Sequence, residues 1–150
     1  MIALIQRVTQ ADVRVDGKAV ARIGPGIAAL IGVLPGDREA DAEGLLARLL
    51  AYRIFSDDAD RMNLSLVDTG GALLLVPQFT LAADTRKGLR PGFSGAAPPE
   101  LGKRLFERLA AAAIKAIGQV QCGVFGAHMQ LSLTNDGPAT FWLQFPPREE

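Results

Sequence analysis

The chain has 150 residues, of which 49% are hydrophobic and 21% are charged, and its sixteen basic residues balance sixteen acidic ones. The composition argues against a disordered or fibrous protein, and the length suits one domain with a continuous core over residues 1–150. Because the formal net charge is zero, the chain lacks the global positive field with which proteins wrap duplex nucleic acid.

The first third of the chain is predicted to be mostly sheet. Apolar alternation and one continuous apolar run place strands at residues 2–8, 13–15, 19–23 and 27–34. The Asp16-Gly17 dipeptide predicts a hairpin before the third of these strands. Asp37 is the expected N-cap of a helix over residues 38–51, where leucines recur at helical spacing, and this helix should cover the sheet.

The rest of the chain alternates strands with one long loop and one long helix. Strands are predicted at residues 52–55, 73–81, 120–125, 129–133 and 141–145, with a polar loop at 56–63 and a turn at 69–71. The loop at 82–99 mixes Gly, Pro and charge over a length that suggests a function. A helix over 99–117 has Pro99 in its first turn and ends at Gly118, and the tail 146–150 is expected to fray.

These elements predict an α/β fold. We expect a single strand-rich domain, with an antiparallel or mixed β-sheet or barrel-like layers covered by two main helices. The predicted location is the cytoplasm. No apolar run approaches the ~20 residues that cross a bilayer, so no membrane partner is expected. The N-terminus is interpreted as a strand and not as a signal peptide, and the single cysteine, Cys122, agrees with a reducing compartment.

Few side chains in this sequence suit catalysis. His128 and Cys122 are the only histidine and the only cysteine. The sequence contains neither a Gly-rich phosphate loop of the required spacing nor a Cys/His metal pattern, so no cofactor and no metal are expected. Any catalysis must therefore rely heavily on backbone geometry.

The segment 77–81, Pro-Gln-Phe-Thr-Leu, lies where an apolar strand meets a polar loop. Such a place can present hydroxyl, amide and backbone N–H groups to a ligand. Thr80 would need a base to act as a nucleophile, and the only imidazole, His128, lies on a different predicted strand. A lone histidine there is interpreted as exposed or hydrogen-bonded, and a threonine at a strand edge without a catalytic role is the alternative interpretation.

The segment 135–140, Asn-Asp-Gly-Pro-Ala-Thr, lies between two predicted strands. Gly137 admits φ values that other residues avoid, and a bond that precedes a proline is the only kind for which cis is cheap. The Gly137-Pro138 pair can therefore present carbonyl oxygens in parallel, although the dipeptide alone favours a plain turn.

Local groups of cations could touch the end of a nucleic acid without any global positive charge. The candidates are Arg86, Lys87 and Arg90 in one loop, and Lys103, Arg104 and Arg108 in one helix. A solvated face is the alternative interpretation of each group.

Together the two segments resemble the signature motifs of D-aminoacyl-tRNA deacylase, the D-tyrosyl-tRNA deacylase family, whose patterns are Ser-Gln-Phe-Thr-Leu and Asn-x-Gly-Pro-x-Thr. Nearly the whole chain shares the resemblance. The flanking matches are residues 1–8, 52–57, 62–64, 81–85 and 141–143. Both motifs at this separation, in a chain of this length, make the identification specific.

The resemblance implies a homodimeric cytoplasmic hydrolase. Such an enzyme cleaves the ester between a D-amino acid and the terminal adenosine of a tRNA, also clears mischarged glycine, and rejects L-aminoacyl-tRNA. It would act in translation quality control as a chiral proofreader, with the aminoacylated tRNA 3′ end and a second copy of the chain as partners.

The resemblance also assigns roles to residues. Gln78, Phe79 and Thr80 fall in the catalytic motif. Gly137 and Pro138 match a Gly-cisPro peptide that reaches into the partner subunit and excludes L-amino acids with main-chain carbonyls.

Further residues would support this site. Arg7 matches an arginine that holds the orientation of the Gly-Pro loop, and Asn135 belongs to the same motif. Phe125 and Met129 lie where the family contacts the terminal adenosine or its pocket. Pro77 departs from the family serine and supplies neither a hydroxyl nor an N–H, which puts any role of those groups in doubt.

The expected mechanism orients an activated ester and stabilises its oxyanion with backbone N–H groups around Phe79 and Thr80. The substrate's ribose hydroxyl would help to activate water, in preference to direct attack by Thr80. The alternatives are a non-catalytic tRNA-end-binding module, an editing-type domain that acts on L-aminoacyl-tRNA, and a general esterase.

Overall fold

The structure, a computed structural model, describes residues 1–147. The strands are β1 (Ile2–Val15), β2 (Lys18–Ile23), β3 (Gly26–Gly32), β4 (Phe55–Ser56), β5 (Met62–Leu64), β6 (Ala72–Pro77), β7 (Val120–Cys122) and β8 (Gln130–Gln144). The helices are α1 (Glu39–Ala51), α2 (Leu66–Thr69), the 3-10 helix η1 (Phe79–Ala82) and α3 (Pro99–Ile117). The predicted mixed α/β fold is confirmed.

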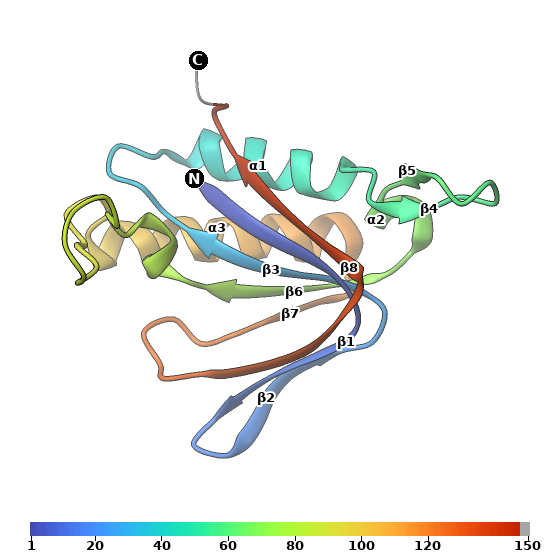
Figure 1. Cartoon of the computed structure of the whole chain (residues 1–150), viewed down its shortest axis with the longest axis horizontal. Helices are drawn as coiled ribbons and strands as arrows, with labels where there is room; N and C mark the ends of the chain where they lie inside the picture. Colours follow the sequence, from blue (N-terminus) through green and yellow to red (C-terminus); the bar gives the residue numbers. More distant parts are fainter. Residues whose placement is uncertain (148–150) are drawn as a thin grey trace.

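The long strand β1 organises the main sheet (Figure 1). The sheet has the order β2-β1-β3-β6-β7, and β8 also pairs with β1. The first half of β1 pairs with β3, its second half pairs with β2, and β8 runs antiparallel along both halves. The β3–β6 and β6–β7 pairs are parallel. Because one strand shares its length among three neighbours, the sheet curls into a barrel-like form.

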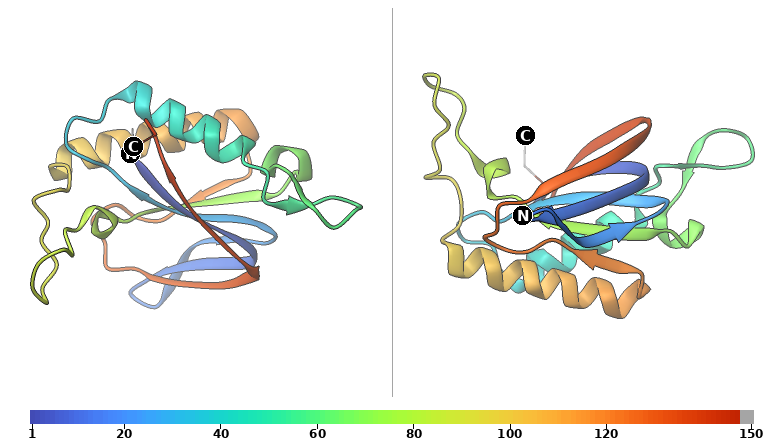
Figure 2. Two further views of the ribbon diagram at one scale, coloured as in Figure 1. Left: turned by 45° about the horizontal axis from the view of Figure 1, so that its top comes forward. Right: turned by 90° about the horizontal axis from the view of Figure 1, so that it is seen from below.

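Helices α1 and α3 lie on one side of the curled sheet (Figures 1 and 2). Their leucines Leu45, Leu49, Leu105 and Leu109 are fully buried in the larger core cluster. Burying one such side chain contributes about 1.5–3 kcal/mol, so these stripes hold the helices to the sheet.

A second core cluster fills the other side, and β6 joins the two. Leu73 and Leu75 of β6 point into the larger cluster, whereas Leu74 and Val76 point into the second one. Successive side chains of a strand point to opposite faces, so a strand that is buried on both faces needs an uninterrupted apolar run. This explains why the sequence of β6 shows no alternation.

Four predicted strands turn out to be parts of two. The strands predicted at 2–8 and 13–15 belong to the single strand β1, and those at 129–133 and 141–145 belong to β8. The intervening residues remain part of these strands because β1 and β8 pair with each other on both sides of the predicted breaks. Interstrand hydrogen bonds override the local sequence pattern here.

Three other predicted strands are too long or displaced. The strand predicted at 73–81 ends at Pro77 and continues as η1, and the one at 120–125 ends at Cys122. The ladder between them stops after Gly123 donates its N–H to the Leu75 carbonyl at 2.8 Å. The strand predicted at 52–55 survives only as β4, which pairs with β5 in a small separate sheet.

The boundaries of α1 correct one predicted cap. Asp37 does not cap the helix, which begins after Arg38, whose N–H donates to Asp41 at 2.8 Å. The Asp37 carboxylate instead accepts the Leu34 N–H at 2.6 Å and lies 3.0 Å from the amine of Met1. A contact that joins residues so far apart in sequence carries no local signal.

The boundaries of α3 are as predicted. Gly118 ends the helix at φ 72°, and its N–H donates to the Ile114 carbonyl at 2.9 Å. Much of the predicted 82–99 loop is irregular, with one bridge between Asp84 and Gly92. Of the tail expected to fray, residues 148–150 lie outside the described part.

Candidate functional site

The second motif forms a bulge inside β8, so its interpretation as a plain turn between two strands is wrong. The flanking pairs are Gln6 with Thr140 and Val8 with Asn135. One residue of β1, Arg7, therefore faces the four β8 residues 136–139. Extra residues on one strand of an antiparallel pair are pushed out of the ladder, and bulges often re-aim groups near functional sites. We call residues 136–139 the bulge.

Asn135 closes the base of the bulge. Its side-chain oxygen accepts the backbone N–H of Ala139 at 2.6 Å, and its side-chain nitrogen donates to the hydroxyl of Thr140 at 2.8 Å. The same nitrogen also lies 3.4 Å from the Ala139 carbonyl oxygen. A side-chain amide that uses both its donor and its acceptor in this way fixes the exit and the return of the chain.

Arg7 of β1 holds the bulge in place through hydrogen bonds. Its Nε donates to the Asp136 carbonyl at 2.8 Å, and its Nη1 donates to the Ile54 carbonyl at 2.6 Å. The Asp136 carboxylate adds a looser contact, with its Oδ2 at 3.9 Å from Nε. The Arg7 side chain is only 13% exposed, so its charge is solvated largely by these carbonyls. The planar guanidinium thus joins the bulge to the segment between α1 and β4.

The outer residues of the bulge are exposed. Gly137 and Pro138 lie at the surface, joined by a cis peptide bond. Gly137 has φ 142°, where side chains are strained, and an added Cβ would lie 2.9 Å from Nη2 of Arg7. The position therefore favours glycine for its backbone conformation, and a side chain there would also have to displace the end of the Arg7 guanidinium.

The first motif is a turn out of a buried strand. The Gln78 N–H donates to the Ile31 carbonyl at 2.7 Å, which fixes the chain at the end of β6. The chain then enters η1, where Phe79 and Thr80 are exposed. The Thr80 hydroxyl donates to Oε1 of Gln78 at 2.6 Å, so it has a neutral acceptor and no general base beside it.

Two backbone donors of this turn are free. Among residues 1–147, neither the Phe79 N–H nor the Thr80 N–H donates a hydrogen bond. The first N–H groups of any helix lack partners within it, so η1 presents these two toward its exposed start.

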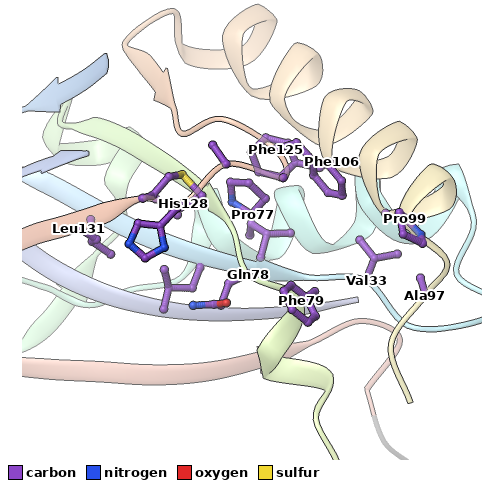
Figure 3. Close-up of a pocket in the computed structure, with 17 residues that line it drawn as sticks. Val33, Pro77, Gln78, Phe79, Ala97, Pro99, Phe106, Phe125, His128 and Leu131 are labelled. Carbon is purple, nitrogen blue, oxygen red and sulfur yellow. The ribbon is translucent and has the colours of Figure 1, made fainter. Parts of the chain in front are cut away.

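A pocket of about 500 Å³ opens beside Gln78 and Phe79 (Figure 3). Its walls come from the ends of β3 and β6, the first turns of α3 and the segment before β8. The side chains that line it include Val33, Val76, Pro77, Gln78, Phe79, Ala97, Pro99, Phe106, Phe125, His128, Met129 and Leu131. Most of them are apolar or aromatic, a lining that suits the face of a flat aromatic group such as a nucleobase.

Phe125 and Met129, the two predicted adenosine contacts, both line this pocket. Phe125 packs against the larger core cluster and Met129 against the second one. The Met129 sulfur also accepts the N–H of Val124 at 3.3 Å. Each side chain is thus held by the protein body while it faces the pocket.

His128 lines the pocket, although from the sequence it is interpreted as a residue without a catalytic role. It lies in the segment before β8, exposed, and lines the pocket together with Gln78 and Phe79 (Figure 3). Its position in the sequence between Phe125 and Met129 was the signal that could have placed it at the pocket. Phe106 and Ile54 carried no local signal, because Phe106 looks like any buried helix residue and Ile54 acts through its carbonyl.

Pro77 fits the strand end that it occupies. The N–H of Gln78 points to β3, and alternate N–H groups of a strand point to opposite neighbours. A donor at position 77 would therefore face β7, whose ladder has already ended at the Leu75–Cys122 pair. Proline is tolerated where no ladder bond is lost.

The two motifs lie apart within one chain. Arg7 pairs with Ile27, and Ile27 pairs with Leu73, so the bulge is level with the start of β6. Gln78 comes five residues after Leu73, a separation of about 16 Å along the strand direction. In Figure 1, β6 runs toward η1 on the left, and β8 bends sharply on the right. One copy therefore does not unite the predicted catalytic residues with Gly137 and Pro138.

Other catalytic arrangements find little support. Burial raises the pKa of the Cys122 thiol, which disfavours the nucleophilic thiolate. Residues 1–147 contain no group of three His, Cys, Asp or Glu side chains arranged to hold a metal ion. Nor does any helix within that range have the length and apolar character to span a membrane.

Comparison with known proteins places this site in context. Residues 4–144 match the D-Tyr-tRNA(Tyr) deacylase family. A protein of Thioalkalivibrio sulfidiphilus (strain HL-EbGR7) named D-aminoacyl-tRNA deacylase is 64% identical over 147 residues, 98% of this chain and 99% of the relative. A protein of the same name from Nitrosococcus oceani is 63% identical and covers 98% of this chain and 95% of the relative.

A solved structure gives the same picture of the fold. The protein named c-Myc DNA Unwinding Element Binding Protein is 34% identical, and it superposes with a TM-score of 0.93 over 98% of this chain and 100% of its own. The match to the family extends over both motifs and over the pocket between β6 and α3. The chain belongs to the D-Tyr-tRNA(Tyr) deacylase family.

Proposed function

We propose that the protein hydrolyses the ester bond of D-aminoacyl-tRNA, and of glycine mischarged on tRNA, and leaves L-aminoacyl-tRNA intact. Residues 1–150 would act as one deacylase domain, in the cytoplasm, for quality control of translation. The observation that carries the proposal is the braced bulge: Arg7 and Asn135 hold the exposed Gly137-Pro138 main chain in a fixed position. It supports chiral selection by backbone atoms.

The proposed site binds the 3′ end of the tRNA in the pocket beside Gln78. Phe125 and Met129 would contact the terminal adenosine, because both line a mainly apolar pocket of about 500 Å³. The aminoacyl ester would then lie at the pocket mouth, next to the exposed start of η1. No cofactor or metal is needed for this chemistry.

The proposed reaction is direct hydrolysis. Water adds to the ester carbonyl carbon, the bond to the ribose oxygen breaks, and the ribose oxygen leaves with a proton. The free N–H groups of Phe79 and Thr80 are suited to stabilise the oxyanion that forms on the carbonyl oxygen. Since the Thr80 hydroxyl has only the amide of Gln78 as its acceptor, the neighbouring ribose hydroxyl of the substrate is the better candidate to orient the water.

Chiral selection in this proposal requires a second copy of the chain. The separation of about 16 Å along the sheet between the bulge and Gln78 keeps them from meeting within one copy. A homodimer in which the bulge of one copy reaches the pocket of the other would bring them together. Main-chain carbonyls of Gly137 and Pro138 would then occupy the space of an L side chain, and a D side chain would point away from them.

The test compares matched D- and L-aminoacyl-tRNA as substrates of the purified protein. The proposal predicts rapid release of D-amino acids with very different side chains and of glycine, with the L-esters intact. Comparable hydrolysis of both enantiomers would refute selection by the bulge. Saturable binding without turnover would instead indicate a tRNA-end-binding module, preference for the L-ester an editing domain, and turnover of simple esters without tRNA a general esterase.

A second experiment separates the two routes to an activated water. Thr80→Ala is expected to lose only a modest factor, about tenfold or less in kcat, whereas a terminal 2′-deoxyadenosine should abolish turnover. Complete loss of turnover in Thr80→Ala with binding retained would overturn the RNA-assisted route.

A further inference from the structure

Residues 84–93, which we call the arm, form a loop that extends away from the rest of the molecule (Figure 2). Its base is closed by two backbone hydrogen bonds between Asp84 and Gly92, of 2.7 and 3.0 Å. Residues 85–91 beyond this base are exposed, and Leu89 at the tip is fully so. The arm is thus fixed at one end and free to meet a partner at the other.

The arm is attached at the rim of the pocket. The ring of Phe93 lies 5.1 Å from that of Phe79, centroid to centroid, in a tilted pair. The chain that follows is fixed by the Ala97 N–H, which donates to the Val33 carbonyl at 3.1 Å. Phe79, Ala97 and Val33 all line the pocket. A ligand whose end fills the pocket would therefore pass close to the arm.

The arm carries a net positive charge, and some of its cations have no acidic partner within the described part of the chain. Asp84 is its only acidic residue, and Arg86 engages that carboxylate through Nε and Nη2, both at 2.9 Å. This pairing holds the pKa of the Asp84 carboxyl well below its usual range. Lys87 and Arg90 have no acidic side chain within 4.0 Å among residues 1–147. In a chain of zero formal net charge, the arm therefore carries a local excess of positive charge beside the pocket.

We infer that the arm binds the phosphodiester backbone of the tRNA acceptor strand next to its 3′ end, with Lys87 and Arg90 as the phosphate contacts. The inference rests on the proposed function, because it takes the terminal adenosine as the occupant of the pocket. The four residue-to-residue steps from Asp84 to Gly88 span at most about 13 Å. At that distance both cations lie beyond the terminal nucleotide, where the groups they can contact are backbone phosphates.

Charge favours RNA over a second copy of the chain as the partner of the arm. The tips of two identical arms carry like charges and would repel each other, whereas a polyanion that releases its counterions gains affinity from each cation. The Asp84–Arg86 pair has a separate use, because it stiffens the base of the arm without consuming the free cations.

The experiment compares two substrates in the variant Lys87→Ala/Arg90→Ala. One is D-aminoacyl-tRNA, and the other is the 3′-D-aminoacyl ester of adenosine, which has no phosphodiester. At about 50 mM salt, the KM for the tRNA substrate should rise about tenfold, and the slope of log(kcat/KM) against log[salt] should become shallower by about one to two. The kcat for the tRNA substrate, and both constants for the adenosine ester, should stay within about twofold.

Two controls isolate the position of the charges. Lys18→Ala/Lys115→Ala removes the same charge from exposed sites on β2 and late in α3, and it should leave the KM and the salt slope as in the unmodified protein. Lys87→Arg/Arg90→Lys keeps both charges on the arm and should restore the KM. Thermal unfolding of every variant checks that the fold is retained.

Three results would overturn the inference. The first is an unchanged KM and salt slope for the tRNA substrate. The second is an equal loss on both substrates, which would mean that the arm acts on the catalytic segment. The third is a change in oligomeric state in the arm variant, which would make the arm a contact between copies. Failure of the unmodified protein to hydrolyse D-aminoacyl-tRNA would be a different result, since it would remove the proposed function itself.

Discussion

The bulge at Gly137 and the turn at Gln78 are both exposed segments next to a buried strand, yet the fold builds them in opposite ways. The bulge is held by side chains: Arg7 donates to the carbonyls of Asp136 and Ile54, and Asn135 accepts the N–H of Ala139 and donates to the hydroxyl of Thr140. The turn is joined to β3 by one backbone hydrogen bond, from the Gln78 N–H to the Ile31 carbonyl, and within residues 1–147 it leaves the N–H groups of Phe79 and Thr80 without acceptors.

This difference matches two kinds of task. A surface that rejects a substrate by shape must not move, so it needs bracing from several directions. A surface that stabilises a developing charge needs free donors in fixed positions, and these would be wasted if the fold paired them. The bulge is suited to exclusion and the turn to charge stabilisation, and four variants, with further substitutions as matched controls, test that division.

The largest effect is expected from Gly137→Ala. The new Cβ would lie 2.9 Å from Nη2 of Arg7, at a φ of 142°. Displacing the braced bulge should lower kcat/KM for D-aminoacyl-tRNA by about 100-fold or more, and strain of about 1–3 kcal/mol should lower the free energy of unfolding. Steady-state kinetics and urea unfolding measure the two effects.

The matched control for this variant is Gly36→Ala. Gly36 also has a positive φ, 83°, but an added Cβ there meets no atom within 4 Å. That variant should lose stability without losing activity. If Gly137→Ala kept kcat/KM within tenfold, the bulge would not be the rigid element described above.

Asn135→Ala should have a smaller effect of the same kind. It leaves the backbone N–H of Ala139 without its acceptor, at a cost of about 1–3 kcal/mol, and loosens the base of the bulge. We expect kcat/KM for the D-ester to fall about tenfold and, as the more telling readout, the preference for the D-ester over the L-ester to narrow. Thr140→Ser keeps the hydroxyl that Asn135 contacts and should remain close to the unmodified protein, whereas Thr140→Val should resemble Asn135→Ala. A loss of stability with an unchanged D/L ratio would make Asn135 merely structural.

Pro77→Ser tests whether the serine of the family motif, which this chain lacks, contributes to activity. The N–H restored at position 77 would face a region where the β7 ladder has ended, so no ladder bond is regained. We expect kcat/KM to change by less than about threefold, because the proposed donors are the N–H groups of Phe79 and Thr80. A gain of tenfold or more would show that a hydroxyl or amide at this position takes part in the reaction.

Asp57→Asn tests a side chain that also fixes backbone N–H groups but lies where no functional site is proposed. Asp57 accepts N–H groups of Ala59 and Arg61 and the side-chain amide of Asn63, much as Asn135 braces the bulge. The backbone hydrogen bond from Arg61 is the main cause that lowers the pKa of Asp57 below its ordinary value of 3.8. We expect lower stability and unchanged activity.

The pH dependence of this variant has a defined sign. A carboxyl whose pKa is lowered by folding stabilises the protein above pH 3.8 and loses that contribution as the pH falls further. The stability difference between Asp57→Asn and the unmodified protein should therefore be full above pH 3.8 and shrink below it. Chemical unfolding at several pH values measures this difference, and a gap that widens toward acid would contradict the assignment.

Local chemistry in the sequence determined several features completely. Helix α3 begins and ends where Pro99 and Gly118 predict, because a proline in the first turn and a glycine at the end act within a few residues. The continuous apolar run at 27–34 indicated a strand buried on both faces, as β3 is, and the two motifs identified the family.

The tertiary structure alone decided how those motifs are used. The register of β1 against β8 turns the predicted loop into a four-residue bulge opposite Arg7, and the carbonyl of Ile54 anchors that arginine. The pocket is lined by residues of β3, β6, α3 and the segment that contains Phe125 and His128. Asp37 pairs with the amine of Met1 and caps no helix. Each of these contacts joins residues far apart in the chain, and such contacts depend on strand register and packing, which local propensity and spacing do not encode.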